Sequence, residues 1–174
     1  MAVIYEAGYQ PDPVFHFDPS RGETEASCFG IELELETRYQ WDFDDLEAIV
    51  SEWGEDYLYL KEDGSLTDGW GLEINFHPVS LSEMKRSPIS DLFDRIFDLR
   101  HHGYVSWKAE DSCGLHIHVD RRRICRYTVH RINQFFLNEK RKIRKLSGRK
   151  TLSLIHISEP TRPLYISYAV FCLK

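Results

Sequence analysis

The sequence predicts a single α+β unit built on a mostly antiparallel sheet. Three segments alternate apolar and polar residues with the period of two that is typical of half-buried strands. These segments are Cys28 to Glu36, Leu72 to His77 and Leu115 to Val119. Three other segments repeat apolar residues at helical spacing. These are Asp42 to Trp53, Ser90 to Arg100 and Thr128 to Gly148. No internal repeat or linker divides the chain, so we expect the strands and helices to share one core.

The first half of the chain begins with residues 1–25, which are rich in Pro, Asp and Gly and predict an irregular or hairpin-like lead-in. We expect the first helix to begin behind an aspartate cap, Asp42, because a short acidic side chain can accept hydrogen bonds from the first turn. A short strand from Tyr57 to Lys61 follows. It ends at Glu62-Asp63-Gly64-Ser65, which has the composition of a turn.

In the second half, Pro78 closes the second alternating strand, because proline cannot donate a backbone hydrogen bond to a sheet. Ser90 is expected to cap the helix that runs to about Arg100. The last helix is predicted as one long element that begins at Thr128 and ends near Gly148.

The last 23 residues, 152–174, resemble a translated sequencing adapter. Leu-Ser-Leu-Ile-His-Ile-Ser-Glu-Pro-Thr-Arg, from Leu152 to Arg162, matches the in-frame translation of a widely used transposon adapter. Ile166 to Leu173 matches the translation of the adjoining adapter stretch. We therefore expect residues 152–174 to be an artefact rather than a domain, and residues 1–151 to carry the fold and the function.

Charge and composition exclude several classes of function. Without Arg162, Lys174 and Glu159, the 22 basic and 28 acidic residues become 20 and 27, so residues 1–151 carry a formal charge of −7. This balance argues against a general nucleic-acid binder. No apolar run has the length of a membrane span, and the N-terminus lacks a signal-peptide pattern. Of the four cysteines, Cys172 lies in the adapter-like tail, and Cys28, Cys113 and Cys125 remain. An odd number of cysteines without a Cys-x-x-Cys pair is typical of reduced thiols, so we expect a soluble cytoplasmic protein.

The three alternating strands carry side chains that can bind metals, opposite their apolar residues. Glu32 and Glu34 stand two residues apart on the first strand, so their carboxylates lie about 7 Å apart on one face. Glu73 supplies a third carboxylate from the second strand, and His116 and His118 supply imidazoles from the third. If the strands are neighbours, these groups converge on an acidic patch that a cation would stabilise.

The alternative explanation is that each strand simply has a solvated face. A glycine beside the polar residues of every strand is a shared design that favours a metal site. These glycines are Gly30, Gly71 and Gly114. The excess of carboxylates favours Mg²⁺ or Mn²⁺ over zinc, which prefers His and Cys. Cys113 would point away from the face of the two histidines, and we interpret it as a small packed thiol.

Four motifs occur in the order found in a known family. They are Phe-Gly-Ile-Glu-Leu-Glu from Phe29, Glu-Asp-Gly-Ser-Leu from Glu62, Gly-Leu-Glu-Ile from Gly71 and Cys-Gly-Leu-His-Ile-His-Val from Cys113. Together they resemble the amidoligases, members of the glutamine synthetase-like carboxylate–amine ligases. The resemblance implies an antiparallel sheet curved around ATP and divalent metals. It also implies that the enzyme joins a small-molecule or peptide carboxylate to an amine through an acyl phosphate.

The resemblance also implies a role for each matching residue. Glu32 and Glu34 would bind two different metal ions, with Glu73 and Asp63 as further ligands. Glu34 and Glu73 are the candidate catalytic residues among these ligands. His116 would bind the second metal, and His118 would contact the phosphates of ATP. Two cations would neutralise the triphosphate and the charge on the transferred phosphoryl group.

The resemblance stops before the end of the chain. In this superfamily a later strand supplies another metal-binding carboxylate and arginines for the phosphates, and the adapter-like residues stand in that place. We therefore expect the fold to be incomplete at the C-terminus and the 174-residue chain to be inactive as a ligase. Arg149, at the end of a basic run that starts at Lys140, is a candidate phosphate contact. The alternative is that this run is a solvated helix face.

Two other functions compete with the ligase. One is a metal-dependent hydrolase that uses His116, His118 and Glu73 to activate water. The other is an acidic binding module without catalysis. Affinity for Mg-ATP separates these hypotheses, because only the ligase requires it.

Overall fold

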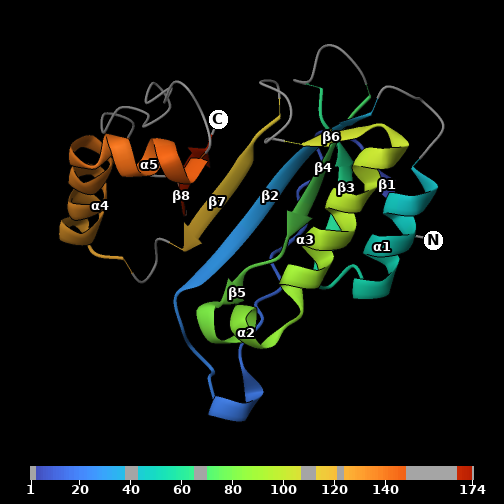
Figure 1. The fold of residues 1–174 in the computed structure, drawn as a ribbon. Helices are drawn as coiled ribbons and strands as arrows, with labels where there is room; N and C mark the ends of the chain where they lie inside the picture. Colours follow the sequence, from blue (N-terminus) through green and yellow to red (C-terminus); the bar gives the residue numbers. More distant parts are fainter. Residues whose placement is uncertain are drawn as a thin grey trace.

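The computed structural model describes residues 3–37, 43–64, 70–106, 113–120, 124–147 and 168–173, and these form an α+β fold with a mixed, open sheet (Figure 1). The expected α+β class is therefore confirmed. The strands are β1 Ile4–Tyr5, β2 Cys28–Thr37, β3 Leu58–Glu62, β4 Trp70–Phe76, β5 Val79–Ser80, β6 Tyr104–Ser106, β7 Leu115–Asp120 and β8 Tyr168–Leu173.

The long strand β2 organises the sheet. The strand order is β1-β3-β4-β2-β7-β8, and β5 and β6 also pair with β2. The two-residue pairing of β1 with β3 is parallel, and every other described strand pair is antiparallel. Because β4 and β7 flank β2, the three alternating segments of the sequence lie side by side.

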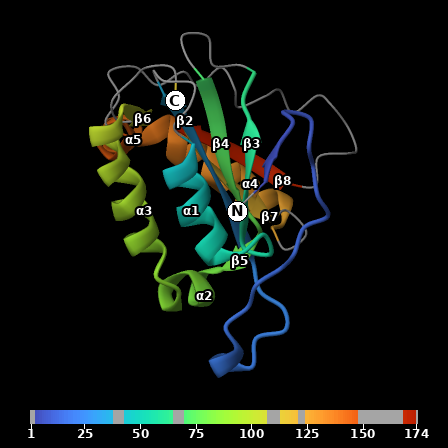
Figure 2. The same cartoon turned by 90° about the vertical axis from the view of Figure 1, so that its right-hand side faces the viewer.

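Helices flank this sheet. They are α1 Asp44–Trp53, α2 Leu81–Arg86, α3 Ile89–Asp98, α4 Arg126–Asn138 and α5 Lys140–Ser147, with short 3₁₀ turns η1 Pro19–Arg21 and η2 Leu99–His102. Figures 1 and 2 show α1 and α3 on one side of β2, β3 and β4, while the N-terminal segment runs along the other side.

The core lies between α1, α3 and the apolar face of the sheet. Leu33, Ile74 and Leu60 come from three neighbouring strands and are fully buried. Leu46 of α1 and Leu92 of α3 belong to the same cluster. Leucine and isoleucine at alternate strand positions meet leucine at helical spacing, so burial of apolar surface stabilises the arrangement.

The expected helix caps need correction. The N-cap of α1 is Phe43, whose side chain makes no cap hydrogen bond, and Asp42 lies outside the described residues. Ser90 lies inside the first turn of α3, whose N-cap is Pro88. Proline before a first helical turn supplies a suitable φ and has no N–H to satisfy, so it can begin the helix without a serine cap.

The expected long last helix is two helices. Glu139 has φ −102° and ψ 27°, outside helical geometry, and it separates α4 from α5. The helix also begins earlier than expected, at Arg126 rather than Thr128, with Cys125 as its N-cap. Periodicity alone did not show this break, because Ile143 follows Phe136 by seven residues, so the apolar stripe stays in phase across the polar residues 138–142.

The sequence pattern did not predict β5, α2 or β6. Ser80, at the end of β5, caps α2, because its Oγ accepts a hydrogen bond from the Glu83 backbone N–H at 3.2 Å. The strands β5 and β6 are short and have no strong period of their own. Both depend on pairing with β2.

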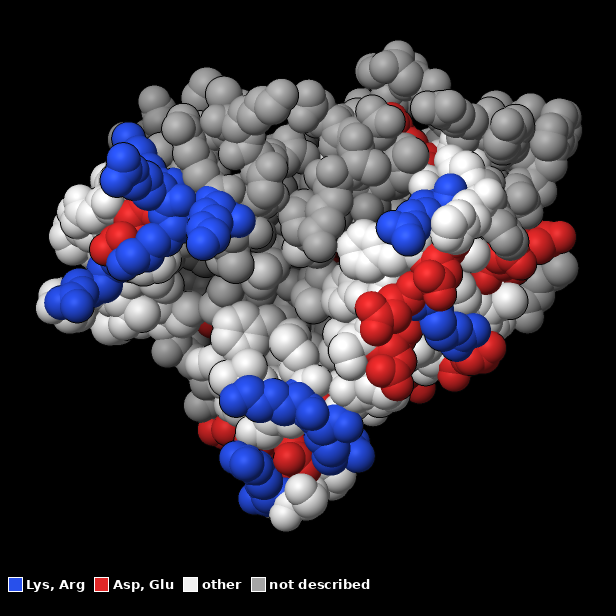
Figure 3. Space-filling view, in the orientation of Figure 1, with Lys and Arg blue, Asp and Glu red and all other residues white. Residues whose placement is uncertain are grey.

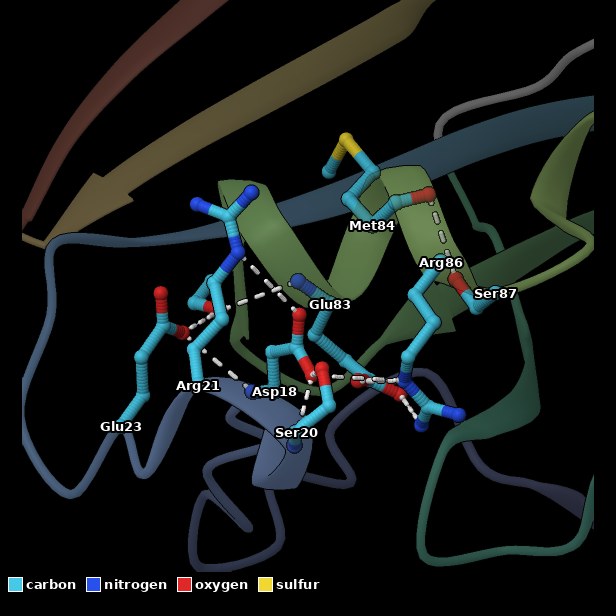
Figure 4. A network of polar contacts seen from close by, with 9 residues as sticks. Asp18, Ser20, Arg21, Glu23, Glu83, Met84, Arg86 and Ser87 are labelled. Atoms are coloured by element: carbon cyan, nitrogen blue, oxygen red, sulfur yellow. Dashed lines mark hydrogen bonds and ion pairs between the residues drawn. The ribbon is translucent and has the colours of Figure 1, made fainter.

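A polar network attaches the N-terminal segment to α2 (Figure 4). The buried carboxylate of Glu83 accepts two hydrogen bonds from the Arg86 guanidinium, at 2.7 and 2.6 Å. Asp18 accepts hydrogen bonds from the backbone N–H and the hydroxyl of Ser20, and one of its oxygens lies 3.8 Å from Arg86 Nε. Glu23 accepts a hydrogen bond from the Ser80 hydroxyl at 2.7 Å. These contacts join residues from distant parts of the sequence.

The adapter-like tail contributes one described element. Strand β8 pairs antiparallel with β7, with Tyr168 opposite Asp120 and Leu173 opposite Leu115. The backbone of β7 therefore has a neighbour on both sides, β2 and β8.

Charged side chains gather in separate areas of the surface. Figure 3 shows basic side chains over α4 and α5 and again at α2, and a mostly acidic area over α1 and α3. Lys140, Arg141, Lys142 and Lys145 of α5 are exposed, so the described part of the basic run is a solvated helix face.

Among the described residues, no helix has the length and apolar character needed to span a bilayer.

Candidate metal centre

The register of the central strands places the polar residues of the three alternating segments on one face. Glu34 lies opposite Glu73 in the β2–β4 ladder, and Glu32 lies opposite His116 in the β2–β7 ladder. Directly opposed residues of an antiparallel pair point to the same side of the sheet. This face is opposite the one covered by α1 and α3, because Leu33 alternates with the two glutamates.

Three of these residues form a compact cluster, which we call the Glu–Glu–His cluster: Glu32, Glu34 and His116. Each offers one ligand atom, and these atoms all lie within 4.8 Å of one another. His116 Nδ1 lies 2.5 Å from Glu32 Oε1, and His116 Nε2 lies 3.5 Å from Glu34 Oε1. Metal–ligand distances of about 2.0–2.6 Å require groups this close.

Both ring nitrogens of His116 therefore face carboxylate oxygens. A neutral imidazole donates from one nitrogen only, and the other carries a lone pair. The second contact is favourable only if that nitrogen holds a proton or if a cation lies between it and the carboxylate. The geometry of His116 thus calls for positive charge at the centre of the cluster.

Glu32 is a perturbed carboxyl of the cluster. Burial raises its pKa, but hydrogen bonds and charge from His116 and His118 outweigh that effect and hold the pKa well below its ordinary value. His118 Nε2 lies 3.1 Å from Glu32 Oε2, so each oxygen of Glu32 faces a histidine. His118, the expected phosphate contact, thereby orients Glu32 in this structure.

Gly114 supports the cluster through its lack of a side chain. A Cβ at this position would lie 2.8 Å from Glu34 Oε2 and 2.9 Å from His116 Nε2, closer than packed atoms approach one another. The Glu34 backbone N–H also donates to the Gly114 carbonyl at 3.0 Å. The glycine therefore leaves space that the two ligand side chains occupy.

Glu73 lies on the same face but has other partners. Lys61 Nζ lies 2.8 Å from Glu73 Oε2, and Asn75 Nδ2 donates to the same oxygen at 3.1 Å. Burial is the main reason that the pKa of Glu73 is raised. The nearby Glu32 charge adds to that rise, and the Lys61 and Asn75 hydrogen bonds oppose it. Glu73 is thus outside the Glu–Glu–His cluster but one strand away from it.

The remaining candidate residues are dispersed. Asp63 is buried just after β3, and its backbone N–H donates to the Gly71 carbonyl at 3.0 Å, but it is outside the cluster. Cys113 is fully buried, as expected of a packed thiol. Arg149 lies outside the described residues.

Lys61 and Asn75 are polar residues of this face that the sequence pattern did not single out. Lys61 lies opposite Glu73 in the β3–β4 ladder, and Asn75 lies opposite Glu32 in the β2–β4 ladder. Alternation in the segment from Leu72 to His77 already places Asn75 on the polar face with Glu73, and alternation in β3 could have placed Lys61 there. Their partners could not be identified without the register between strands.

The arrangement suits a hard divalent cation. Two carboxylates and one imidazole offer oxygen and nitrogen ligands, and a cation would neutralise the like charges of Glu32 and Glu34. Comparison with protein-family models, curated proteins and solved structures finds no match for this chain. The support for a function therefore comes from its residues and their geometry.

Proposed function

We propose that this chain carries the metal-binding part of an ATP- and divalent-metal-dependent ligase that joins a carboxylate to an amine. The observation that supports this proposal most is the convergence of Glu32, Glu34 and His116 on one sheet face. The four motifs of the sequence favour a glutamine synthetase-like fold and the amidoligase reaction over other uses of such a cluster.

The proposed reaction has two steps. An oxygen of the substrate carboxylate attacks the γ-phosphorus of ATP, the bond to the bridging oxygen breaks, and ADP leaves with that electron pair. The amine nitrogen then attacks the acyl carbon of the acyl phosphate and expels inorganic phosphate. The nitrogen loses a proton, and an amide remains.

The residues of the chain would act by binding and orientation. Glu32, Glu34 and His116 would hold Mg²⁺ or Mn²⁺, which when bound neutralises the triphosphate and the charge that develops during phosphoryl transfer. His118 would keep Glu32 in position through its 3.1 Å contact, and it could reach a phosphate oxygen as the resemblance implies. Gly114 would preserve the space of the ligand side chains.

Metal and nucleotide binding by the 174-residue chain test the proposal without requiring turnover. Mn²⁺ should bind, and ATP should bind more tightly when Mn²⁺ is present. Glu34→Gln should weaken Mn²⁺ binding by at least about tenfold, because it removes a charged ligand at nearly constant shape. Glu62→Gln at the exposed end of β3 is the charge-matched control and should bind Mn²⁺ like the unchanged protein.

Two outcomes would contradict the proposal. Absence of Mn²⁺ binding would exclude the metal centre itself. Mn²⁺ binding that depends on Glu34 without any affinity for ATP would count against the ligase and favour the hydrolase or the acidic binding module. Titration calorimetry of the two ligands in turn, with unfolding of each variant followed by circular dichroism, provides these measurements.

A further inference from the structure

Lys61 is the only lysine or arginine in the four strands β2, β3, β4 and β7 that form the polar face. Its register partner on β4 is Glu73, whose own partner on β2 is Glu34. Lys61, Glu73 and Glu34 therefore form one row across three strands. The row continues to Tyr5 of β1, so a single ammonium group lies between a tyrosine and two carboxylates.

The Lys61–Glu73 ion pair is largely removed from solvent. The side chains are 16% and 11% exposed, and the charged atoms are 2.8 Å apart. A pair this buried stays favourable only while each charge has a partner. If Glu73 turned to another partner, the Lys61 ammonium would need a new anion.

The Glu–Glu–His cluster, one strand away, offers Glu73 a second partner. Directly opposed side chains of an antiparallel pair have Cβ atoms about 4.5–5.5 Å apart. The Glu73 carboxylate can therefore rotate from Lys61 toward the Glu–Glu–His cluster, where a bound cation would attract it. In the absence of that cation, Lys61 is the better partner because the cluster holds two other carboxylates.

We propose that Glu73 exchanges Lys61 for the metal when a cation binds, and that the released Lys61 ammonium then binds an oxyanion of the ligand. This inference rests on the proposed function and assigns Lys61 as its residue for anion recognition. The shared chemistry of the ligand is a carboxylate or a phosphate group. Metal and oxyanion binding would be coupled through one side chain, and each would strengthen the other.

The test measures binding of two oxyanions, ATP and L-glutamate, with and without saturating Mn²⁺. Lys61→Met should bind Mn²⁺ at least as tightly as the unchanged protein, but its oxyanion affinity with Mn²⁺ present should fall about tenfold or more. Lys61→Arg keeps the charge and should bind the oxyanion more tightly than Lys61→Met. Lys85→Met, at an exposed position on α2, is the control and should change neither affinity.

Glu73→Gln tests the exchange by changing the other member of the ion pair. It removes the carboxylate that engages Lys61, so the oxyanion should bind more tightly without Mn²⁺ than it does to the unchanged protein. A merely structural role of the ion pair does not produce this gain. The variant also keeps the inference testable if Lys61→Met fails to fold.

The two ligands identify the source of the oxyanion. If Lys61→Met lowers the affinity for ATP alone, the oxyanion that Lys61 binds is a phosphate. If it lowers the affinity for L-glutamate alone, the oxyanion is a carboxylate. Either result supports the inference. If Mn²⁺ binds but neither ligand responds to Lys61→Met or Glu73→Gln, the inference is overturned and the metal centre stands. If Mn²⁺ does not bind the unchanged protein, the metal centre and the inference are both overturned.

Discussion

Glu34 and Glu73 stand directly opposite each other across the β2–β4 ladder, yet their carboxylates have different partners. Glu34 lies 3.5 Å from His116, and Glu73 lies 2.8 Å from Lys61. The two glutamates share a face but not a cluster. The cause is the position of β4 between β2 and β3, because Glu73 has a carboxylate on one side and an ammonium group on the other.

Gly114→Ala tests whether the Glu–Glu–His cluster depends on the space beside it. The new Cβ would displace Glu34 Oε2 or His116 Nε2, so Mn²⁺ affinity should fall by about tenfold or more. Gly64→Ala is the matched control, since a Cβ added there would meet no atom within 4 Å. Equal Mn²⁺ affinity of the Gly114→Ala variant and the unchanged protein in calorimetric titration would show that the ligand side chains do not need this space.

Arg86→Met should destabilise the protein by about 1–3 kcal/mol, because the buried Glu83 carboxylate would lose both hydrogen bonds from the guanidinium. Arg95→Met also breaks a two-bond contact, with Glu52, but both side chains there are well exposed. The loss of unfolding free energy should be much smaller for Arg95→Met, because solvent screens an exposed pair. Urea denaturation of the two variants provides the comparison. Similar losses of unfolding free energy in the two variants would mean that burial of Glu83 does not govern the strength of its ion pair with Arg86.

Glu32 should make stability depend on pH in the acidic range. Its folded pKa lies below the ordinary value, so the carboxylate stabilises the fold fully above its unfolded pKa of about 4.3. That contribution is lost as the pH falls from there toward the lowered folded pKa. The free energy of unfolding should therefore differ more between the unchanged protein and Glu32→Gln at pH 6 than at pH 3. A constant difference in urea titrations at both values would contradict this assignment.

Deleting residues 152–174 should leave the midpoint of thermal unfolding unchanged or raise it. The expectation follows from the adapter-like sequence, since no selection would have fitted such residues to the core. The structure supplies the competing effect, because β8 pairs with β7 from Tyr168 to Leu173. A clear decrease in the midpoint, measured by circular dichroism on both chain lengths, would show that this edge strand stabilises the sheet.

Periodicity predicted the central strands because their alternation has a direct physical cause. Leu33 enters the core and the neighbouring glutamates face the other way, so the pattern of β2 is visible in the sequence itself. Helix starts were harder to predict. Ser90 has the right chemistry for a cap, but Ser80 performs that role for a helix that the sequence pattern did not predict. A cap depends on backbone geometry that serine alone does not specify.

The sequence by itself determined which residues share a face of each strand, because alternation with a period of two is a property of the chain. It therefore placed Glu32 and Glu34 together, and His116 with His118. Only the tertiary structure decided the partners between strands: His116 beside both glutamates, and Lys61 beside Glu73. The physical reason is register, since shifting one strand by one residue turns its side chains to the other face, and the register depends on the packing of the whole sheet.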